Sequence, residues 1–537
     1  MKTLSLKSIF SVIVLTGLSS AGVFGQNSVS SDVLDINNIR TTINANGHLF
    51  GSLLNIPEAE KRSFEIKNTD GKHAIRIAGI WMGGKEGNKY HIYAPTFGEW
   101  GRDVFPGPVM KEEFYSIAED ARWDRVWKVS KETVKNHITN FATPGYIMPE
   151  EIANWPASGD IEKGQSPNLA PFVDANANGI YDPQNGDYPS IKGDEAILFI
   201  FNDHRGQHTE SGTFSMGVEV IGMAYAFAST FSKTYDNTIF VDFTIINHSE
   251  FDYTETKLGV FTDIDLGANI FDDYEGVDIK RNTYYGYNSD FSKNAEMFGK
   301  SHTPFMSVTL LNEPFTSYMT YNNDFNLCGN PVAPLDYYLY LNGYWKDGMA
   351  ITKGGIGKGG NEHCSYMYDG NPITGAGWTE KSVNNIPGDR RGLGIVGPFD
   401  FKKGFIKKIS VAYNFSSDFE RMQTNADKYT GDFKNNSGPF APEAPAFASN
   451  SGLNDLKPLD MIVYPNPVHT STTLFFSNPN NEVFNINIYD ITGRKIFSEN
   501  QLTGTQYQFN ASKLDKGLYV IELAFKESRN STRLVVQ

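Results

Sequence analysis

Apolar residues recur at every second position in short runs along this chain, and this alternation constrains its fold more than any other feature. Residues 238–247 are the clearest case, with apolar side chains on one face at Ile239, Val241, Phe243 and Ile245. Side chains point to opposite faces of a strand in turn, so a period of two predicts a strand with one face in a core. The sequence therefore predicts a mainly β fold of antiparallel sheets.

The composition agrees with many short strands joined by turns. The 537 residues include 50 glycines, 25 prolines, 27 tyrosines and 38 phenylalanines, and aromatic residues favour strands, whereas glycine and proline favour turns. Only a few short helices are expected, among them one capped by Ser130 and one from about Asp418 to Tyr429. The formal net charge of −15 argues against a nucleic-acid partner, whose phosphates would be repelled.

The first 25 residues have the pattern of a secretory signal peptide. Lys2 and Lys7 precede an apolar run over residues 9–18, and small residues follow as far as Gly25. This run is too short for a permanent membrane anchor, and no second long apolar stretch follows. We therefore expect an exported chain without a transmembrane helix.

The rest of the chain divides by composition into three parts. A cargo region, β-rich and antiparallel, is expected first, and a division of it into two subdomains near residue 250 stays open. A segment with several prolines is expected to be a linker before a small C-terminal β domain. The predicted boundaries are 1–25 for the signal peptide, 26–432 for the cargo region, 433–459 for the linker and 460–537 for the last domain.

Three short motifs mark the C-terminal domain. A rigid Tyr-Pro-Asn-Pro segment at 464–467 excludes a helix. A D-x-x-G-R turn at 490–494 and an L-x-x-G-x-Y segment at 514–519 each lead into an apolar run that alternates like a strand. Together with the basic and apolar C-terminus, they predict a small β domain.

These motifs closely resemble the type A C-terminal sorting domain of the type IX secretion system. The resemblance implies a small immunoglobulin-like β-sandwich that the type IX secretion machinery recognises. It also implies passage through the periplasm to the outer surface of a Gram-negative cell, or release from it. The resemblance covers only the last residues of the chain, so it indicates a destination and assigns no activity to the cargo region.

The stretch from residue 174 to 189 has the pattern of a calcium-binding loop. Aspartate and asparagine alternate at 174, 176 and 178, Gly179 permits a sharp turn, and a further aspartate follows at the ninth position. Asn185 stands at the twelfth position, where an EF-hand has a glutamate, so Asp187 is the candidate for the missing carboxylate. The predicted ligands are Asp174, Asn176, Asn178, the carbonyl of Ile180, Asp182 and Asp187. The alternative is a surface loop of Asx turns that binds nothing.

A second acidic group predicts a weaker calcium site. In an extended segment Asp263 and Asp265 point the same way, so they can share a cation with Asp272 and Asp273. A solvated acidic loop and an acid pair for glycoside hydrolysis are the alternatives. The arginines that follow Asp389 are candidates to pair with these acidic loops.

The two cysteines, Cys328 and Cys364, are candidates for a disulfide, because an exported protein meets an oxidising environment. Such a bridge would stabilise the fold by roughly 3 to 4 kcal/mol in the chain-entropy model. The alternative is two free thiols.

Five segments of the cargo region stand out together: Trp81-Met82-Gly83-Gly84, Trp155-Pro156, residues 174–189, residues 262–278 and Asp389-Arg390-Arg391. In these segments the cargo region resembles a class of large secreted proteins that carry the same sorting domain and have no assigned function. Its sequence contains no G-x-S-x-G motif and no zinc-protease motif. We therefore favour a calcium-stabilised binding or structural protein with a surface glycan or protein as its ligand. The alternative is a secreted hydrolase that acts on polysaccharide or protein.

Overall fold

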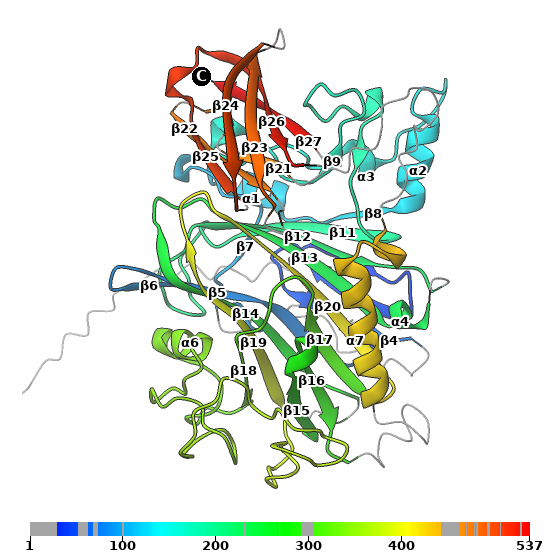
Figure 1. The fold of residues 1–537 in the computed structure, drawn as a ribbon. Coiled ribbons are helices and arrows are strands. Elements are labelled where there is room, and N and C mark those ends of the chain that lie inside the picture. Colours follow the sequence, from blue (N-terminus) through cyan, green and yellow to red (C-terminus); the bar gives the residue numbers. More distant parts are fainter. Residues whose placement is uncertain are drawn as a thin grey trace, which may run out of the picture.

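The computed structural model describes residues 29–51, 63–67, 73–98, 101–229, 232–267, 269, 271–290, 304–441 and, with short gaps, 461–536. The predicted signal peptide lies outside the described residues. Figure 1 shows a large β-rich body with α7 along one side and the C-terminal domain at one end. The strands pair antiparallel throughout both parts, so the predicted mainly β, antiparallel fold is confirmed.

The first large sheet of the cargo region is built around β14, which pairs with β5 on one side and with β19 on the other. Among the described residues it has nine strands in the order β1-β2-β3-β5-β14-β19-β18, and β4 and β6 pair with β2 and β5. Their bounds are β1 (Ser31–Leu34), β2 (Ile39–Asn44), β3 (Leu49–Phe50), β4 (Glu65–Ile66), β5 (Ile77–Glu86), β6 (Lys89–Tyr93), β14 (Tyr253–Ile264), β18 (Ser317–Asn322) and β19 (Arg390–Phe401).

The second large sheet contains the strands that the sequence predicts most clearly. Its nine described strands follow the order β15-β16-β17-β20-β13-β12-β11-β7, and β8 also pairs with β11. Their bounds are β7 (Phe105–Pro106), β8 (Trp127–Ser130), β11 (Glu195–Asn202), β12 (Val218–Ala226), β13 (Thr238–Asn247), β15 (Asp273–Asp278), β16 (Thr283–Asn288), β17 (Phe305–Leu310) and β20 (Ile406–Ser416).

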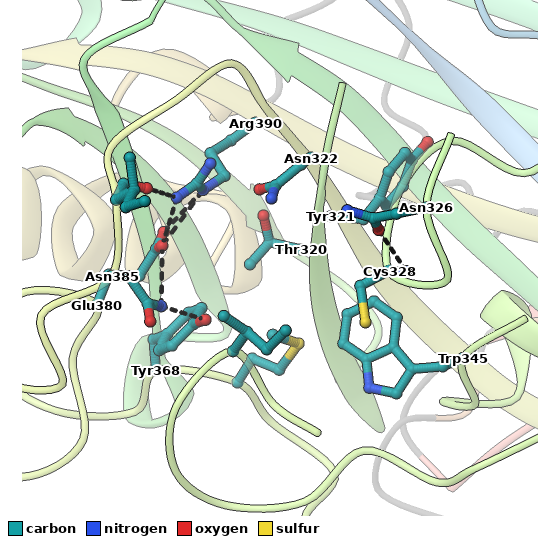
Figure 2. Close-up of a pocket in the computed structure, with 13 residues that line it drawn as sticks. Thr320, Tyr321, Asn322, Asn326, Cys328, Trp345, Tyr368, Glu380, Asn385 and Arg390 are labelled. Carbon is teal, nitrogen blue, oxygen red and sulfur yellow. Dashed lines mark hydrogen bonds and ion pairs between the residues drawn. The ribbon is translucent and has the colours of Figure 1, made fainter. Parts of the chain in front are cut away.

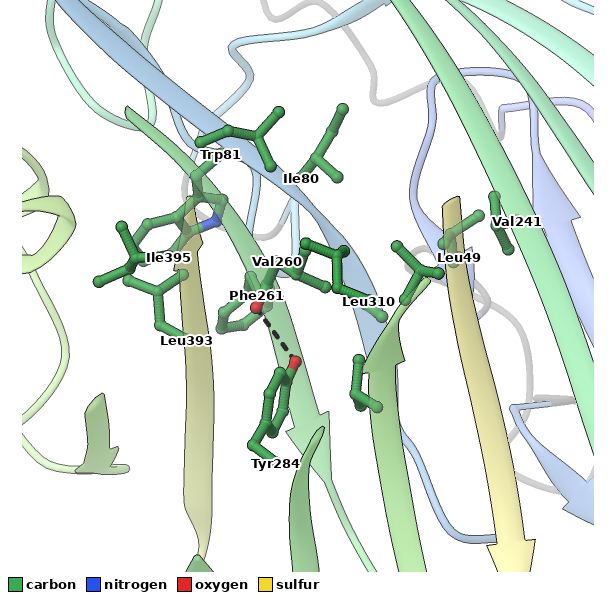
Figure 3. Close-up of a cluster of buried hydrophobic side chains, with 14 of the residues drawn as sticks. Leu49, Ile80, Trp81, Val241, Val260, Phe261, Tyr284, Leu310, Leu393 and Ile395 are labelled. Atoms are coloured by element: carbon green, nitrogen blue, oxygen red, sulfur yellow. Dashed lines mark hydrogen bonds between the residues drawn. The ribbon is translucent and has the colours of Figure 1, made fainter. Parts of the chain in front are cut away.

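The main hydrophobic core contains side chains from both sheets. Alternate residues of β13, among them Val241 and Phe243, belong to it together with Leu49 and Val260 of the first sheet. In Figure 3 the side chains of Leu49, Val241 and Val260 lie between strands of the two sheets. The hydroxyl of Tyr284 donates to the carbonyl of Val260 at 3.0 Å. The two sheets are therefore fixed against each other by one shared core.

The second sheet is buried on its other face as well. Leu198 and Ile200 of β11 pack there with Trp123 and Trp127, whose rings lie 6.1 Å apart. Both tryptophans are buried core residues. Because both faces are covered, β11 is an unbroken apolar run instead of an alternating one.

The helices are few and short. Those with defined bounds are α1 (Ile117–Trp123), α2 (Lys131–Asn140), α3 (Glu150–Ala153), α4 (Lys233–Asp236), α6 (Pro334–Leu341) and α7 (Phe419–Lys434). Ser130 caps α2 by accepting from the backbone N–H of Thr133, and Asp418 caps α7 in the same way, so both predicted helices are confirmed. Within the described residues, none of the helices has the length and apolar character needed to span a bilayer.

The cargo region does not divide near residue 250. Strand β5, from before this point, pairs with β14, and β13 pairs with β20 from after it. The shared core also draws side chains from both sides. Strands from both sides of residue 250 pair with each other, so no boundary between two subdomains lies there. Local sequence patterns do not reveal pairing between strands that are distant in the chain.

The expected linker at 433–459 begins later than predicted. Helix α7 continues to Lys434, and Phe440 packs its ring edge-on against Phe240 at 5.2 Å. Residues up to 441 therefore belong to the cargo region, because the ring of Phe440 packs against its hydrophobic core. The rest of the predicted linker lies outside the described residues.

The C-terminal domain is a small two-sheet β structure with its own core. Three strands follow the order β21-β22-β25 and four follow β24-β23-β26-β27 in its described part. Side chains of both sheets, including Leu474 and Ile521, form one cluster, in agreement with the predicted small β-sandwich. The bounds are β21 (Met461–Tyr464), β22 (Ser471–Phe476), β23 (Phe484–Asp490), β24 (Lys495–Leu502), β25 (Gln506–Asn510), β26 (Gly517–Ala524) and β27 (Arg529–Val536).

Replacement of Phe261 by alanine tests the central role of β14. Its fully buried ring stacks on Trp81 with centroids 5.2 Å apart, so Phe261→Ala should lower the free energy of unfolding by about 3 to 5 kcal/mol. Phe325 is 75% exposed, and Phe325→Ala should change it by less than about 0.5 kcal/mol. Urea denaturation of the purified protein measures both, and equal effects would contradict this assignment of the core.

Candidate functional site

The predicted calcium loop connects β9 (Phe172–Val173) to β10 (Tyr188–Pro189), which pair antiparallel. Asp187 closes the loop at its base, where its carboxylate accepts from the backbone N–H of Ala175 at 2.8 Å and of Asp182 at 2.9 Å. Burial raises the pKa of the Asp187 carboxyl. Asp187 therefore holds the two ends of the loop together.

The other predicted ligands converge above this base. The carboxylate of Asp174 accepts from the backbone N–H groups of Asn178 and Gly179 at 3.0 and 2.7 Å. The carboxylate of Asp182 accepts from the side-chain amides of Asn176 and Asn178 at 3.0 and 2.9 Å.

Other contacts complete the loop. A third amide, that of Asn185, donates to Asp182 at 2.7 Å and is the main cause of the lowered pKa of this carboxyl. The side chain of Ile180 points to solvent, and its backbone N–H donates to the amide oxygen of Asn178. On the outside, the guanidinium of Arg533 in the C-terminal domain donates to the carbonyl of Ala177.

A second acidic cluster is buried in the first sheet. One carboxylate oxygen from each of Asp263, Asp265 and Asp389 lies within 4.8 Å of the others, and all three side chains are buried. Asp263 stands directly opposite Arg391 in the antiparallel pair of β14 and β19. This register brings the end of β14 to the start of β19.

Sequence reasoning predicts two of the three members of this cluster. Asp263 and Asp265 are together as expected, whereas Asp389 takes the place expected for Asp272 and Asp273. Those two share the side-chain amide of Asn288, which donates to them at 2.7 and 2.8 Å. The sequence did contain one indication of a role for Asp389. It directly precedes Arg390 and Arg391, and the side chains of these arginines were expected to pair with the acidic loops.

The guanidinium groups of that turn do pair with acids, on two opposite faces of β19. Arg391 forms an ion pair with Asp263 at 3.5 Å and donates to Asp389. Arg390 forms a buried ion pair with Glu380 at 2.8 Å. Adjacent residues of a strand point to opposite faces, so one strand contributes to two separate polar groups.

The Arg390–Glu380 pair lines a cavity of about 170 Å³ between β18, the start of β19 and the loops around residues 326–386. Figure 2 shows Arg390, Glu380 and Asn385 on one side of it and Trp345 and Cys328 on the other. The side-chain amide of Asn385 donates to the hydroxyl of Tyr368 at 2.7 Å. The lining residues are Thr320, Tyr321, Asn322, Asn326, Cys328, Trp345, Ile356, Met367, Tyr368, Glu380, Asn385, Ile386 and Arg390.

The cavity lining holds one carboxylate, that of Glu380. Most glycoside hydrolases use two carboxyl groups across the substrate. The acidic cluster has three, but they are buried and not in an open groove.

The predicted disulfide is not formed in the structure. Cys328 and Cys364 are both free thiols. Burial raises the pKa of each thiol to about 11, so neither is activated as a nucleophile at neutral pH.

Comparison with known proteins gives one clear match. Residues 462–537 match the family of the secretion system C-terminal sorting domain. This confirms the prediction that the chain carries a type IX sorting domain as an exported cargo, and it supports a place at the cell surface or in the extracellular space. No curated protein matches the chain.

Two solved structures show a weak likeness. One is a polysaccharide lyase with 7% identity and a TM-score of 0.18, covering 68% of this chain and 38% of the lyase. The other is dimeric latent PorU from Porphyromonas gingivalis, with 12% identity and a TM-score of 0.13, covering 64% of this chain and 32% of PorU. The chain thus spans less than two fifths of either protein, and these scores carry no argument about fold or function.

The buried carboxyl group of Glu275 predicts that the stability of the fold depends on pH. Glu275 accepts from the hydroxyl of Tyr318 at 2.7 Å, and burial raises its pKa from 4.5 to about 8. Between these values the folded chain keeps a proton that the unfolded chain has lost, so this group's contribution falls by up to about 1.4 kcal/mol per pH unit as pH rises.

Glu275→Gln should remove this contribution to the slope of unfolding free energy against pH between about pH 5 and pH 8. The exposed Glu420 serves as a matched control, and Glu420→Gln should keep the wild-type slope. Urea denaturation at several pH values measures both, and an unchanged slope in Glu275→Gln would rule out a protonated Glu275.

Proposed function

We propose that this chain is a calcium-stabilised binding or structural protein that the type IX pathway carries through the periplasm of a Gram-negative cell to its outer surface or into the medium. The sorting domain supports the route. The observation that carries the calcium assignment is the convergence of Asp174, Asn176, Asn178 and Asp182 in one loop.

A calcium ion fits the chemistry of this loop. Calcium takes six to eight oxygen ligands, and carboxylates, amide oxygens and backbone carbonyls all serve. Asn176 and Asn178 each carry an amide oxygen beside the amide group that now donates to Asp182. Rotation of these two amides would turn their oxygens towards an ion held by Asp174 and Asp182.

The cavity that Arg390 lines supports a binding role for the cargo region. Its volume of about 170 Å³ is well above the roughly 10 to 15 Å³ that holds one water molecule, so there is room for a small ligand group such as a sugar ring. The aromatic rings of Trp345 and Tyr368 and the amides of Asn322 and Asn385 line it. Such surfaces suit a polar ring, so a surface glycan is the ligand we favour over a protein.

Deletion of residues 461–537 tests the route of export. Without the sorting domain the cargo region should accumulate in the periplasm of the native host, because the type IX machinery has nothing to recognise. Cell fractionation with immunoblotting measures this. Full-length Asp174→Ala, which leaves the sorting domain intact, should still reach the surface or medium, and normal secretion of the truncated chain would refute the route.

Removal of calcium tests the loop. Binding to the folded state alone stabilises by about 2.7 kcal/mol when calcium exceeds its dissociation constant a hundredfold. A chelator should therefore lower the melting temperature of the purified wild-type protein, and Asp174→Ala should lose most of that response. Calorimetry with and without added calcium measures the difference.

The exposed Asp400 provides a matched control for this experiment. Asp400→Ala removes one carboxylate far from the loop in sequence and should respond to chelator like the wild type. If Asp174→Ala keeps the full response, the loop is not the calcium site and the segment is a set of Asx turns.

A further inference from the structure

We propose that Asp263, Asp265 and Asp389 form a second, buried site that holds one divalent cation through carboxylate oxygens. The site is separate from the loop at Asp174 and does not depend on it. It joins the end of β14 to the start of β19, two segments more than 120 residues apart in the sequence.

The spacing of the three carboxylates matches the coordination shell of a cation. Calcium–oxygen distances are about 2.3 to 2.6 Å, so two ligands on opposite sides of the ion are about 5 Å apart. One oxygen of each of Asp263, Asp265 and Asp389 lies within 4.8 Å of the other two. One ion between them would therefore reach all three.

Oxygens of this cluster lack hydrogen-bond donors. Both carboxylate oxygens of Asp263 and Oδ1 of Asp265 are buried without a hydrogen-bond partner among the described residues. Asp263 is fully buried and Asp265 is 3% exposed. A buried polar atom without a partner lowers the stability of the fold by about 1 to 3 kcal/mol, and by more when it is charged. A bound cation would remove this penalty for the three oxygens.

The nearby positive charges do not balance the cluster. Arg391 is the buried guanidinium beside it, 3.5 Å from Asp263, and it also donates to Asp389. The partly exposed Arg76 acts on Asp263 and Asp265 from further away. Asp273, another buried carboxyl, lies close enough to interact with Asp265. Four carboxyl groups thus share two guanidinium groups. One divalent cation would balance the excess negative charge.

The ligand type narrows the choice of ion. Three carboxylates without histidine or thiolate are hard oxygen donors, which suit calcium and magnesium rather than zinc or copper. We favour calcium because it tolerates irregular coordination, whereas magnesium demands near-octahedral geometry and retains waters. A buried cluster has little room for those waters.

A shared proton is the competing explanation for the unpartnered oxygens. Two carboxyl groups held close together can keep one proton between them. Replacement of Asp265 by asparagine separates the two cases, since asparagine resembles the protonated acid in shape but removes a negative ligand. A cation site loses its ion in this variant, whereas a proton-sharing pair is left intact or made more stable.

The test starts from the Asp174→Ala protein, which lacks the loop site. The purified chain is equilibrated with about 1 mM CaCl₂, within the range of weak extracellular calcium sites, or with MgCl₂ instead. It is then gel-filtered into metal-free buffer, and bound metal is counted by mass spectrometry. We expect one calcium per chain in Asp174→Ala and none in Asp174→Ala/Asp265→Asn, which should also melt at a lower temperature.

Two results would overturn the proposal. Asp174→Ala without bound calcium or magnesium would exclude the site, and this arm needs no change to the cluster. A double variant that keeps its metal, or that melts no lower than Asp174→Ala, would favour the shared proton. If Asp265→Asn does not fold, Asp389→Asn is used in its place. The chelator response of wild-type protein against Asp174→Ala tests the loop separately, so either site can fail alone.

Discussion

The antiparallel pairing of β14 with β5 and β19 is the constraint on which the rest of the cargo region depends. It places Phe261 against Trp81 in the core. The same register puts Asp263 opposite Arg391 at the end of the strand. A slip of one residue would send each of these side chains to the other face, so the core and the polar groups are fixed together.

Burial of charge shapes the end of this sheet. Arg390 and Glu380 satisfy each other, and Glu380 also accepts from the backbone N–H of Glu275 at 2.8 Å. On the opposite face the acids outnumber the guanidinium groups. Taking an ion out of water costs several kcal/mol unless it is paired. The two faces of β19 therefore differ. One face carries an ion pair that lines the cavity, and the other carries a cluster with more carboxyl groups than guanidinium groups.

The sorting domain and the cargo region are separate parts of the fold. The sorting domain has its own core, and its identity rests on motifs that stand alone in the sequence. The cargo region is held by the core that its two large sheets share. Each part thus has its own hydrophobic core.

The sequence by itself determined the features that depend on neighbouring residues. Period-two alternation fixed strands such as β13, side-chain caps fixed the starts of α2 and α7, and the loop at Asp174 is complete within 14 residues. Turn and cap chemistry acts over a few residues, so local patterns suffice. Only the tertiary structure decided that Asp389 joins Asp263, that β5 pairs with β14 across residue 250, that Phe440 extends the cargo region and that the cysteines are free thiols. These contacts depend on strand register and core packing between distant segments, which no local pattern encodes.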